Sequence, residues 1–294
     1  MIQHERATVF KSVTAVNNTG RGGSDPGSGE RMREIFAAAG LSHAVVIDAA
    51  PETVEKALAD AAASAGVVVV LGGDGTVRTA AIACGRAEKF LIALPGGTMN
   101  MLPHALYGNI SWEAALADTL AAPSVRDVSG GMVEGQAFFC AAVLGAPSLW
   151  ADAREALRRG HPIEAIRRSA TALRRASDAL EYRFDDGARG SAEAVVVLCP
   201  LVSRAMVADD LFLEAAAVAP VTASGMFSLA FHAVFDDWRR DPAVSLTQVK
   251  TARISGHGRV PVILDGERAT MGRTVRVTFS PLAFRALVPA ERAA

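Results

Sequence analysis

Residues 67–76 read Val67-Val68-Val69-Val70-Leu71-Gly72-Gly73-Asp74-Gly75-Thr76. The unbroken apolar run predicts a strand that is buried on both faces. A helix-like stretch, 77–85, follows the glycines, so they lie at a strand-to-helix turn. Glycine at such a turn allows positive φ and a close approach of backbone N–H groups to a ligand, and the N-terminus of a helix favours phosphate.

Asp74 is an acidic residue inside this phosphate-favouring turn. A carboxylate beside bound phosphate makes sense if it holds Mg²⁺ or takes a proton from a hydroxyl nucleophile. The turn therefore suggests phosphoryl transfer. The structural alternative is an ordinary strand-to-helix turn with Asp74 as the N-cap, since Gly-rich turns are common in α/β proteins.

Composition is that of a globular protein with a substantial core. The chain has 294 residues, enough for two domains, of which 50% are hydrophobic and 21% charged. A net charge of −1 gives no argument for a nucleic-acid partner. The polar N-terminus does not resemble a signal peptide, and no apolar run approaches the roughly 20 residues of a membrane span. Three widely spaced cysteines, Cys84, Cys140 and Cys199, are expected to be reduced core thiols. We therefore expect a cytoplasmic protein that can be peripheral to the inner face of the membrane.

The first part of the chain alternates predicted strands and helices. Strands are expected at 8–16, 44–47, 67–71 and 90–94, and helices at 31–39, 51–63, 77–85 and 111–121, the last with Ser111 as N-cap. This alternation predicts a mostly parallel sheet flanked by helices. Ligands of such sheets bind beyond the carboxyl ends of the strands, where the Gly-rich loops 17–24, 72–76 and 95–98 are expected.

The pattern changes after Pro123. Strands are expected at 125–133, 137–143, 192–198, 227–233, 248–254, 260–264, 274–279 and 284–288, with a helical insert at about 149–180. The predicted fold is thus an α/β nucleotide-binding domain, 1–124, followed by an antiparallel β-sandwich domain, 125–294.

Several standard motifs are excluded. The chain has no GxGxxG fingerprint, no GxxxxGK[ST] loop and no HExxH pair, and nothing suggests a Ser-His-Asp triad. Three other motifs remain, in the order Gly72-Gly73-Asp74-Gly75-Thr76, Pro95-Gly96-Gly97-Thr98-Met99-Asn100 and Leu264-Asp265-Gly266-Glu267.

In this combination the chain resembles the diacylglycerol kinase catalytic-domain family, which includes bacterial lipid kinases, sphingosine kinases and ceramide kinases. GGDGT alone is shared with NAD kinases and phosphofructokinases, whereas GGDGT, GTxN and DGE together are specific to the lipid-kinase branch. The resemblance covers essentially the whole length. It implies the related fold, a parallel α/β domain followed by a β-rich lipid-binding domain.

The resemblance also implies the site residues. Asp74 would lie near the transferred phosphoryl group and Mg²⁺, and Glu267 would accept the proton of the lipid hydroxyl. The nucleotide pocket for ATP would be formed by Asn17, Thr19, Gly20, Gly72, Gly73, Gly75, Thr76, Gly97, Thr98 and Asn100, with Asp265 beside Glu267. The structural alternative for 265–267 is a two-residue hairpin turn carrying surface acids, since Asp-Gly is favoured there.

Some positions depart from the family pattern. Asn18 replaces the usual proline of the first loop, and Met99 and Met101 flank Asn100 where many relatives have Gly and Asp. Asp210 matches an aspartate that holds a structural Mg²⁺ in some bacterial members, but Leu211 replaces the glycine that follows it. A solvated acidic turn is the alternative there.

The predicted insert carries a cluster of arginines between positions 154 and 175, interleaved with apolar residues at near-helical spacing. One interpretation is a basic amphipathic surface that docks on anionic lipid headgroups. The other is a solvated helical face paired locally with acidic residues.

The sequence therefore predicts an ATP- and Mg²⁺-dependent lipid kinase, with the lipid hydroxyl near Asp74 and Glu267 and the β domain supplying an apolar groove for the acyl chains. The alternatives are an NAD kinase and a homologue that binds nucleotide or lipid but has lost catalysis. An NAD kinase is disfavoured by Gly97-Thr98-Met99-Asn100, whereas lost catalysis is suggested by the departures at Asn18, Met101 and Leu211. Neither the identity of the lipid nor the oligomeric state can be read from the sequence.

Overall fold

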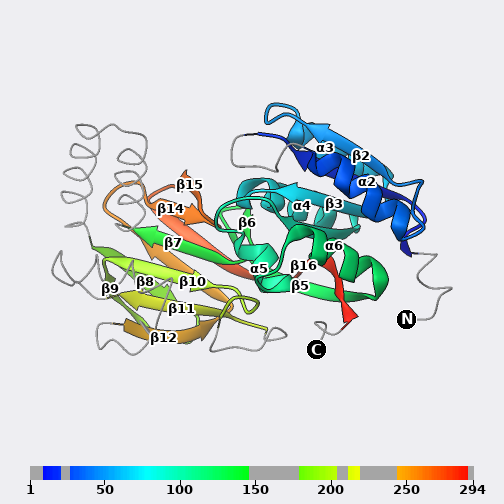
Figure 1. Cartoon of the computed structure of the whole chain (residues 1–294). Helices are drawn as coiled ribbons and strands as arrows, with labels where there is room; N and C mark the ends of the chain where they lie inside the picture. Colours follow the sequence, from blue (N-terminus) through cyan, green and yellow to red (C-terminus); the bar gives the residue numbers. More distant parts are fainter. Residues whose placement is uncertain (1–8, 21–26, 146–178, 204–210, 219–243, 291–294) are drawn as a thin grey trace. The chain divides into compact units, whose positions relative to one another are not determined.

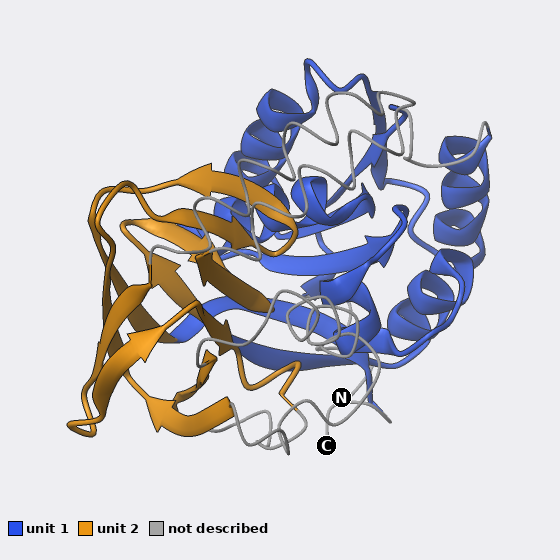
Figure 2. Cartoon of the chain, turned by 90° about the vertical axis from the view of Figure 1, so that its left-hand side faces the viewer, with its two compact units in different colours: residues 1–129, 281–294 blue, residues 130–280 orange. Residues whose placement is uncertain are grey.

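The computed structural model describes residues 9–20, 27–145, 179–203, 211–218 and 244–290 (Figure 1). The chain forms two compact units, Met1–Ser129 with Pro281–Ala294, and Gly130–Ser280 (Figure 2). The sequence analysis put a single boundary near residue 124 and the whole C-terminal end in the β-rich domain. The end of the chain belongs instead to the first unit, because the last part of strand β16 (Thr274–Pro289) pairs with β4 (Phe90–Pro95).

The first unit is a parallel sheet with helices. Its strands lie in the order β2-β1-β3-β4-β16 and all four pairings are parallel. The other strands are β1 (Val13–Asn18), β2 (Val45–Ala49) and β3 (Val67–Gly72). The helices are α2 (Ser28–Ala38), α3 (Val54–Ser64), α4 (Asp74–Ala87), α5 (Met101–Tyr107) and α6 (Trp112–Ala121). The predicted parallel α/β architecture is confirmed.

Strand β3 forms the centre of this sheet. It pairs with β1 on one side and β4 on the other, and each residue from Val67 to Leu71 has an exposed fraction of 0%. The apolar run is therefore buried on both faces, as predicted. Helix α4 follows directly and buries Val77, Ala80, Ala81 and Cys84 along one side.

Several elements of the first unit differ from the sequence prediction, and two helices begin three residues earlier than expected, α2 at Ser28 and α4 at Asp74. The strand expected at 8–16 begins only at Val13 and continues through Asn17 and Asn18, which were expected in a loop. Helix α5 was not predicted at all, because it has seven residues, includes Pro103 and is preceded by Asn100 in the left-handed conformation. The predicted N-cap of α6 is confirmed, since the Ser111 hydroxyl accepts the N–H of Ala114 at 3.2 Å.

The second unit contains a six-stranded antiparallel sheet and the antiparallel part of the ten-stranded sheet to which β16 and the parallel strands also belong. The strands of the six-stranded sheet lie in the order β12-β11-β10-β7-β14-β15. In the other, the first part of β16 pairs with β13, β13 with β8 and β8 with β9, while β5 pairs with β6. The strands are β5 (Pro123–Val133), β6 (Gln136–Phe138), β7 (Ala141–Gly145), β8 (Leu180–Phe184), β9 (Arg189–Ala192), β10 (Ala194–Leu198), β11 (Leu213–Val218), β12 (Val244–Val249), β13 (Thr251–Ser255), β14 (Pro261–Leu264) and β15 (Glu267–Thr270).

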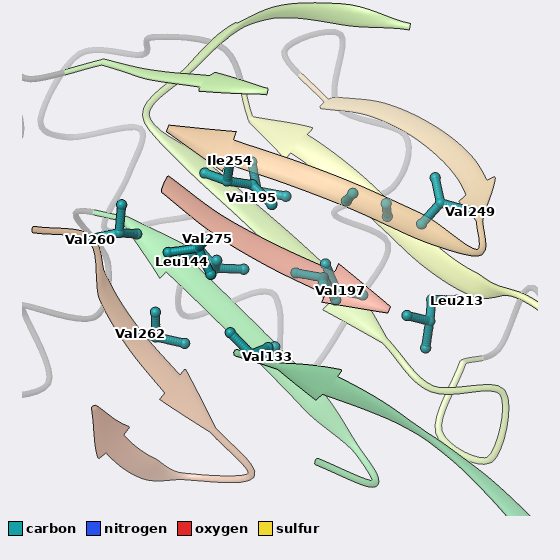
Figure 3. Packing of buried hydrophobic residues seen from close by; sticks show 14 of the residues in the cluster. Val133, Leu144, Val195, Val197, Leu213, Val249, Ile254, Val260, Val262 and Val275 are labelled. Atoms are coloured by element: carbon teal, nitrogen blue, oxygen red, sulfur yellow. The ribbon is translucent and has the colours of Figure 1, made fainter. Parts of the chain in front are cut away.

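One hydrophobic core joins these two sheets (Figure 3). Leu144, Val195 and Val197 come from the six-stranded sheet, and Ile254 and Val275 from the other. All five are fully buried, as expected when the inner faces of two antiparallel sheets pack together. The predicted antiparallel β-sandwich is confirmed.

The limits of several strands in this unit differ from the prediction. Strands β8, β9, β11 and β15 were not expected, and Leu180, assigned to the helical insert, is the first residue of β8. The strand expected at 248–254 is two strands, β12 and β13, and those expected at 274–279 and 284–288 are one, β16. The strand expected at 227–233 and most of the insert lie outside the described residues.

Candidate functional site

The carboxyl ends of three neighbouring strands of the first unit carry the predicted nucleotide-binding residues. Strands β1, β3 and β4 run parallel, with Asn17 beside Leu71 and Gly72 beside Pro95. The loops that follow these strands therefore start at one edge of the sheet. This is the edge at which parallel α/β sheets bind their ligands.

The glycines at this edge pack against one another. A Cβ on Gly97 would lie 2.6 Å from the Cα of Gly73, and a Cβ on Gly96 would lie 2.7 Å from the backbone nitrogen of Gly72. The Gly96 N–H also donates to the Gly72 carbonyl at 3.0 Å. None of these four glycines has positive φ, so the conformational reason given from the sequence is wrong for them. At Gly96 and Gly97 glycine is required because the two loops touch backbone to backbone, whereas a Cβ on Gly72 would meet the Thr76 side chain at 2.9 Å.

Asp74 connects the same two loops through its side chain. It is the first residue of α4, and its Oδ2 accepts the N–H of Asn100 at 3.1 Å while its Oδ1 accepts the N–H of Met101 at 2.7 Å. Asn100 and Met101 stand at the start of α5, where N–H groups have no intrahelical acceptor. Asp74 therefore caps a different helix from its own, which the sequence alternative of a local N-cap did not foresee.

Asn100 closes the loop that leads to α5. It adopts φ +49°, its Oδ1 accepts the N–H of Gly97 at 2.7 Å, and its Nδ2 donates to the Gly97 carbonyl at 2.9 Å. Asparagine tolerates this left-handed conformation better than most residues. Both ends of its amide are thus used inside the loop, whereas Thr98 within the same loop is exposed.

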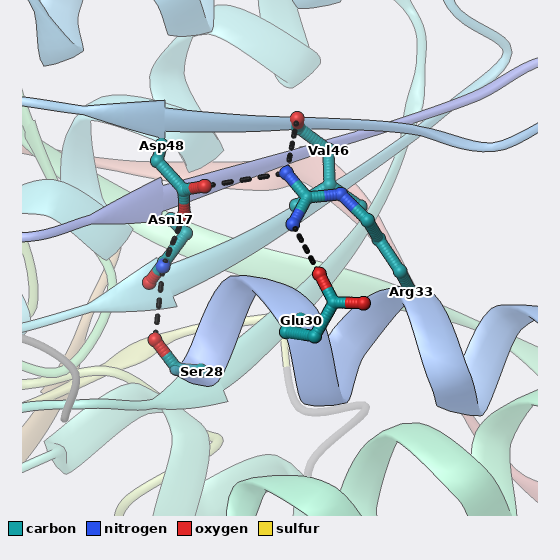
Figure 4. A network of polar contacts seen from close by, with 6 residues as sticks. All are labelled: Asn17, Ser28, Glu30, Arg33, Val46 and Asp48. Carbon is teal, nitrogen blue, oxygen red and sulfur yellow. Dashed lines mark hydrogen bonds and ion pairs between the residues drawn. The ribbon is translucent and has the colours of Figure 1, made fainter. Parts of the chain in front are cut away.

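Asn17, at the end of β1, is 1% exposed and lies in a polar network (Figure 4). Its Nδ2 donates to the Ser28 hydroxyl at 2.9 Å and to Oδ1 of Asp48 at 2.7 Å. Arg33 pairs in turn with Asp48 at 3.3 Å and with Glu30 at 3.2 Å. Both amide hydrogens of Asn17 are therefore used to join β1 to β2 and α2.

Asn18, which sequence reasoning noted only as a departure from the family, connects the first two loops. Its Nδ2 donates to the Thr76 hydroxyl at 2.8 Å, and its Oδ1 accepts the N–H of Gly20 at 3.0 Å. The neighbouring Thr19 hydroxyl donates to the Ala49 carbonyl at 3.2 Å. The structure thus brings Thr76 to the first loop through a side chain that the usual proline could not provide.

The donors at the start of α4 give this edge its capacity for phosphate. The Val77 N–H bonds to the Gly73 carbonyl, so the N–H groups of Asp74, Gly75 and Thr76 precede the first intrahelical hydrogen bond. Unpaired amides and the positive end of the helix dipole form an anion site. Asp74, Gly75 and Thr76 are also only partly buried, so the residues present fit a bound polyphosphate.

The third predicted motif forms the hairpin between β14 and β15. Leu264 pairs with Glu267, and Asp265 and Gly266 between them have φ +48° and +87°. Positive φ at both central residues is typical of a type I′ turn, which Asp-Gly favours. The structural alternative given for this motif is therefore correct as far as the backbone is concerned.

The two carboxylates of this hairpin have different surroundings. Asp265 is 5% exposed and accepts the N–H groups of Phe139, Cys140 and Ala141 at 2.7, 2.8 and 2.9 Å, whereas the side chain of Glu267 is exposed. Asp265 thus holds the segment between β6 and β7. Sequence reasoning assigned it to the nucleotide and missed this structural role.

The part of the chain that the structure describes contains neither a cluster of metal ligands nor a membrane-spanning helix. There, no three His, Cys, Asp or Glu side chains are grouped so as to hold a metal ion, and Asp210 falls outside this part. The Arg cluster at 154–175 also falls outside it. No helix that could cross a membrane is found between residues 9 and 290 where the structure describes the chain.

Comparison with known proteins agrees with the motifs. Residues 12–133 match the diacylglycerol kinase catalytic domain, which defines a family of ATP-using lipid kinases. The match includes Asp74 and both glycine loops and ends before the β14–β15 hairpin. No curated protein matches the chain.

Solved structures share the fold over almost the whole length. A diacylglycerol kinase from Bacillus anthracis strain Sterne is 17% identical, with 96% of this chain and 97% of that chain covered and a TM-score of 0.66. A candidate diacylglycerol kinase from the same strain is 18% identical, with 96% and 98% covered and a TM-score of 0.70. An NAD kinase from Archaeoglobus fulgidus in complex with ATP is 11% identical, with 96% and 95% covered and a TM-score of 0.56.

Proposed function

We propose that the protein is an ATP-dependent kinase that phosphorylates the hydroxyl group of a lipid. The observation that carries this proposal is the position of Asp74. Its carboxylate joins the GGDGT and GTxN segments at the carboxyl edge of a parallel sheet, within the residues that match the kinase family. A local turn would not require an acidic residue that reaches to Asn100 and Met101.

In this proposal the first N–H groups of α4 bind phosphate oxygens of ATP, and the exposed Thr98 hydroxyl adds a further donor. The lipid hydroxyl oxygen attacks the γ-phosphorus as the bond to ADP breaks, and its proton passes to Glu267. Glu267 suits a proton acceptor because its carboxylate is exposed, whereas the Asp265 carboxylate is used by backbone N–H groups. Mg²⁺, when bound with ATP, would neutralise charge on the phosphates, with Asp74 as its carboxylate ligand.

Asp265 supports this chemistry indirectly. It fixes the turn that ends at Glu267 and, by accepting three N–H groups, ties that turn to the chain between β6 and β7. A general base must be held in position to be effective, and a rigid type I′ turn limits its movement. We therefore assign Asp265 a positioning role and not a direct contact with the nucleotide.

The test is to incubate the purified protein with radiolabelled ATP, Mg²⁺ and lipid in mixed micelles, using a diacylglycerol and a sphingoid base in parallel, and to separate the labelled products. A labelled lipid that Glu267→Gln no longer forms supports the proposal. Binding of ATP without transfer to either lipid would indicate a homologue that has lost catalysis. Phosphorylation of NAD in place of lipid would indicate an NAD kinase, and either result overturns the proposal.

A further inference from the structure

Four arginines stand in register across four adjacent strands of the second unit. Arg189 of β9 is opposite Arg183 of β8, Arg183 is opposite Arg253 of β13, and Arg253 is opposite Arg276 of β16. We refer to Arg189, Arg183, Arg253 and Arg276 as the arginine row. Residues that are directly opposite lie on the same face of a sheet, so all four side chains leave the same face.

This face is the outer one. The neighbouring row, Tyr182, Ile254 and Val275, faces the hydrophobic core, where Ile254 and Val275 are 0% exposed. Side chains alternate between the two faces of a strand, so the arginine row points away from the core. All four arginines are exposed. With a strand spacing of about 4.8 Å, the row extends over roughly 14 Å.

The sandwich itself gives no reason for this arrangement. Like charges that are directly opposite destabilise a sheet. In the described ranges, none of the four guanidinium groups forms an ion pair or a cation–π contact. The carboxylate of Asp185, two residues after Arg183, accepts the N–H groups of Lys250 and Thr251 through Oδ2. Among the residues that the structure describes, the row therefore has no ion-pair partner for its positive charge.

Three members of the row line an open pocket of about 450 Å³. The next row on the same face supplies Glu181, Ser191 and Ser255 to the same pocket. The Ser191 hydroxyl can donate a hydrogen bond, and the Ser255 hydroxyl is shared with that of Thr274 at 3.1 Å. Arg183, Arg189 and Arg253 supply guanidinium groups, which bind phosphate through paired N–H groups. The chemistry of the pocket therefore suits a phosphate-bearing partner.

We propose that the arginine row is a docking surface for anionic phospholipid headgroups. The row is straight and exposed, so it can contact several phosphates that lie in one plane, as they do at a membrane surface. A single soluble phosphate would be held better by donors that converge in a closed site. The choice of a membrane rests on the proposed function, because the lipid substrate of such a kinase lies in a bilayer.

The test uses sedimentation with vesicles and needs neither ATP nor a lipid substrate. Full-length protein is mixed with vesicles of phosphatidylcholine alone or with 30% phosphatidylglycerol. We expect pelleting with the anionic vesicles only, and less pelleting in high salt. Replacing two arginines, Arg183→Gln with Arg253→Gln, should weaken the partition by about 30-fold, the effect of two basic side chains at an anionic surface.

A matched control removes the same charge from the first unit. Lys11 and Arg86 are exposed there, and Lys11→Gln with Arg86→Gln should leave the partition within about twofold of wild type. The row variant should also melt no lower than wild type, because it relieves repulsion between neighbouring arginines. Equal partition of the row variant and wild type would overturn the proposal, as would an equal loss in the control.

Two further outcomes separate this proposal from related ones. Tight binding of a DNA oligonucleotide through the row, without binding to anionic vesicles, would show a different polyanion as partner and overturn the lipid assignment. Loss of vesicle binding by the row variant with full phosphorylation of a short-chain, water-soluble lipid supports docking as a function separate from catalysis. If no lipid is ever phosphorylated but vesicle binding depends on the row, the kinase proposal fails while the docking proposal stands.

Discussion

Oδ1 of Asp74 accepts a hydrogen bond from the backbone N–H of Met101 at 2.7 Å. Met101 is the first residue of α5, so the acidic residue of one motif holds the start of the helix that follows the other motif. Asp74 therefore has a structural contact in addition to the catalytic role proposed for it. A substitution at Asp74 must be judged on both stability and activity.

We predict that Asp74→Asn lowers both. An amide offers one acceptor oxygen and places an NH₂ group against a backbone N–H donor, which should lower the free energy of unfolding by about 1–3 kcal/mol. Phosphoryl transfer should fall by at least about 100-fold, since the carboxylate charge is lost. Thermal denaturation followed by circular dichroism measures the first effect, and transfer of label from ATP to lipid measures the second.

Ser111→Ala is the matched control for the loss of stability. It removes the N-cap of α6 in the same unit, which should cost about 1 kcal/mol, but leaves Asp74 and both glycine loops unchanged. We expect this variant to retain nearly full activity well below its melting temperature. If it loses as much activity as Asp74→Asn, then the effect at Asp74 reflects instability and not chemistry.

The two carboxylates of the β14–β15 hairpin should respond differently to the same substitution. Glu267→Gln should melt within about 0.5 kcal/mol of wild type, as exposed substitutions usually do, and lose phosphoryl transfer. Asp265→Asn should lose about 2–4 kcal/mol, because one acceptor oxygen then faces three buried N–H groups. Urea denaturation and the kinase assay, run on both variants, separate the two roles. Comparable stability losses in the two variants would contradict this division.

Much of the fold could be predicted because its signals are local. The run 67–71 is apolar at every position, and Ser111 precedes a helix with a hydroxyl that can cap it. Strands β8 and β15 were missed because their sequences, Leu180–Phe184 and Glu267–Thr270, have several exposed polar residues. Strand β8 is fixed by pairing with β13, which lies far along the chain. Strand β15 is fixed by pairing with β14 across the hairpin turn, and not by an apolar pattern of its own.

The sequence motifs predict where the candidate site lies, but they do not predict which contacts each of its residues makes. Gly96 and Gly97 were recognised as motif residues, yet the reason for glycine there is a contact between loops that are more than 20 positions apart. Asn18 was noted only as a departure, although it donates to Thr76 across 58 positions. Such contacts depend on strand order, which a motif does not contain.

Gly97→Ala tests the packing of the two glycine loops. The new Cβ would lie 2.6 Å from the Cα of Gly73, and because the neighbour is backbone the loops must move apart. We expect a loss of about 1–3 kcal/mol in stability, as for other overpacked sites, and an ATP affinity reduced by at least about tenfold. Isothermal titration calorimetry measures the affinity. Gly258→Ala is the control, since nothing lies within 4 Å of its Cβ and its φ is not positive, and it should change neither quantity.

The reactivity of the three cysteines tests how well the cores of both units exclude solvent. Cys84, Cys140 and Cys199 are buried and form no disulfide, as the sequence predicted, and burial raises the pKa of the Cys84 thiol from 9.0 to about 12. The pKa of Cys199 is also raised well above its usual value, by burial and then by the nearby Asp265 carboxylate. At pH 8 a thiol with a pKa near 12 is a thiolate in only about one molecule in 10⁴, so it is a poor nucleophile. We therefore expect native protein to react with Ellman's reagent only slowly at pH 8, and its rate to keep rising about tenfold per pH unit between pH 7 and 9, where the rate of free cysteine levels off as the pH passes its pKa. All three thiols should react at once in 6 M guanidinium chloride, and rapid reaction of one thiol in native protein would contradict the burial described for it.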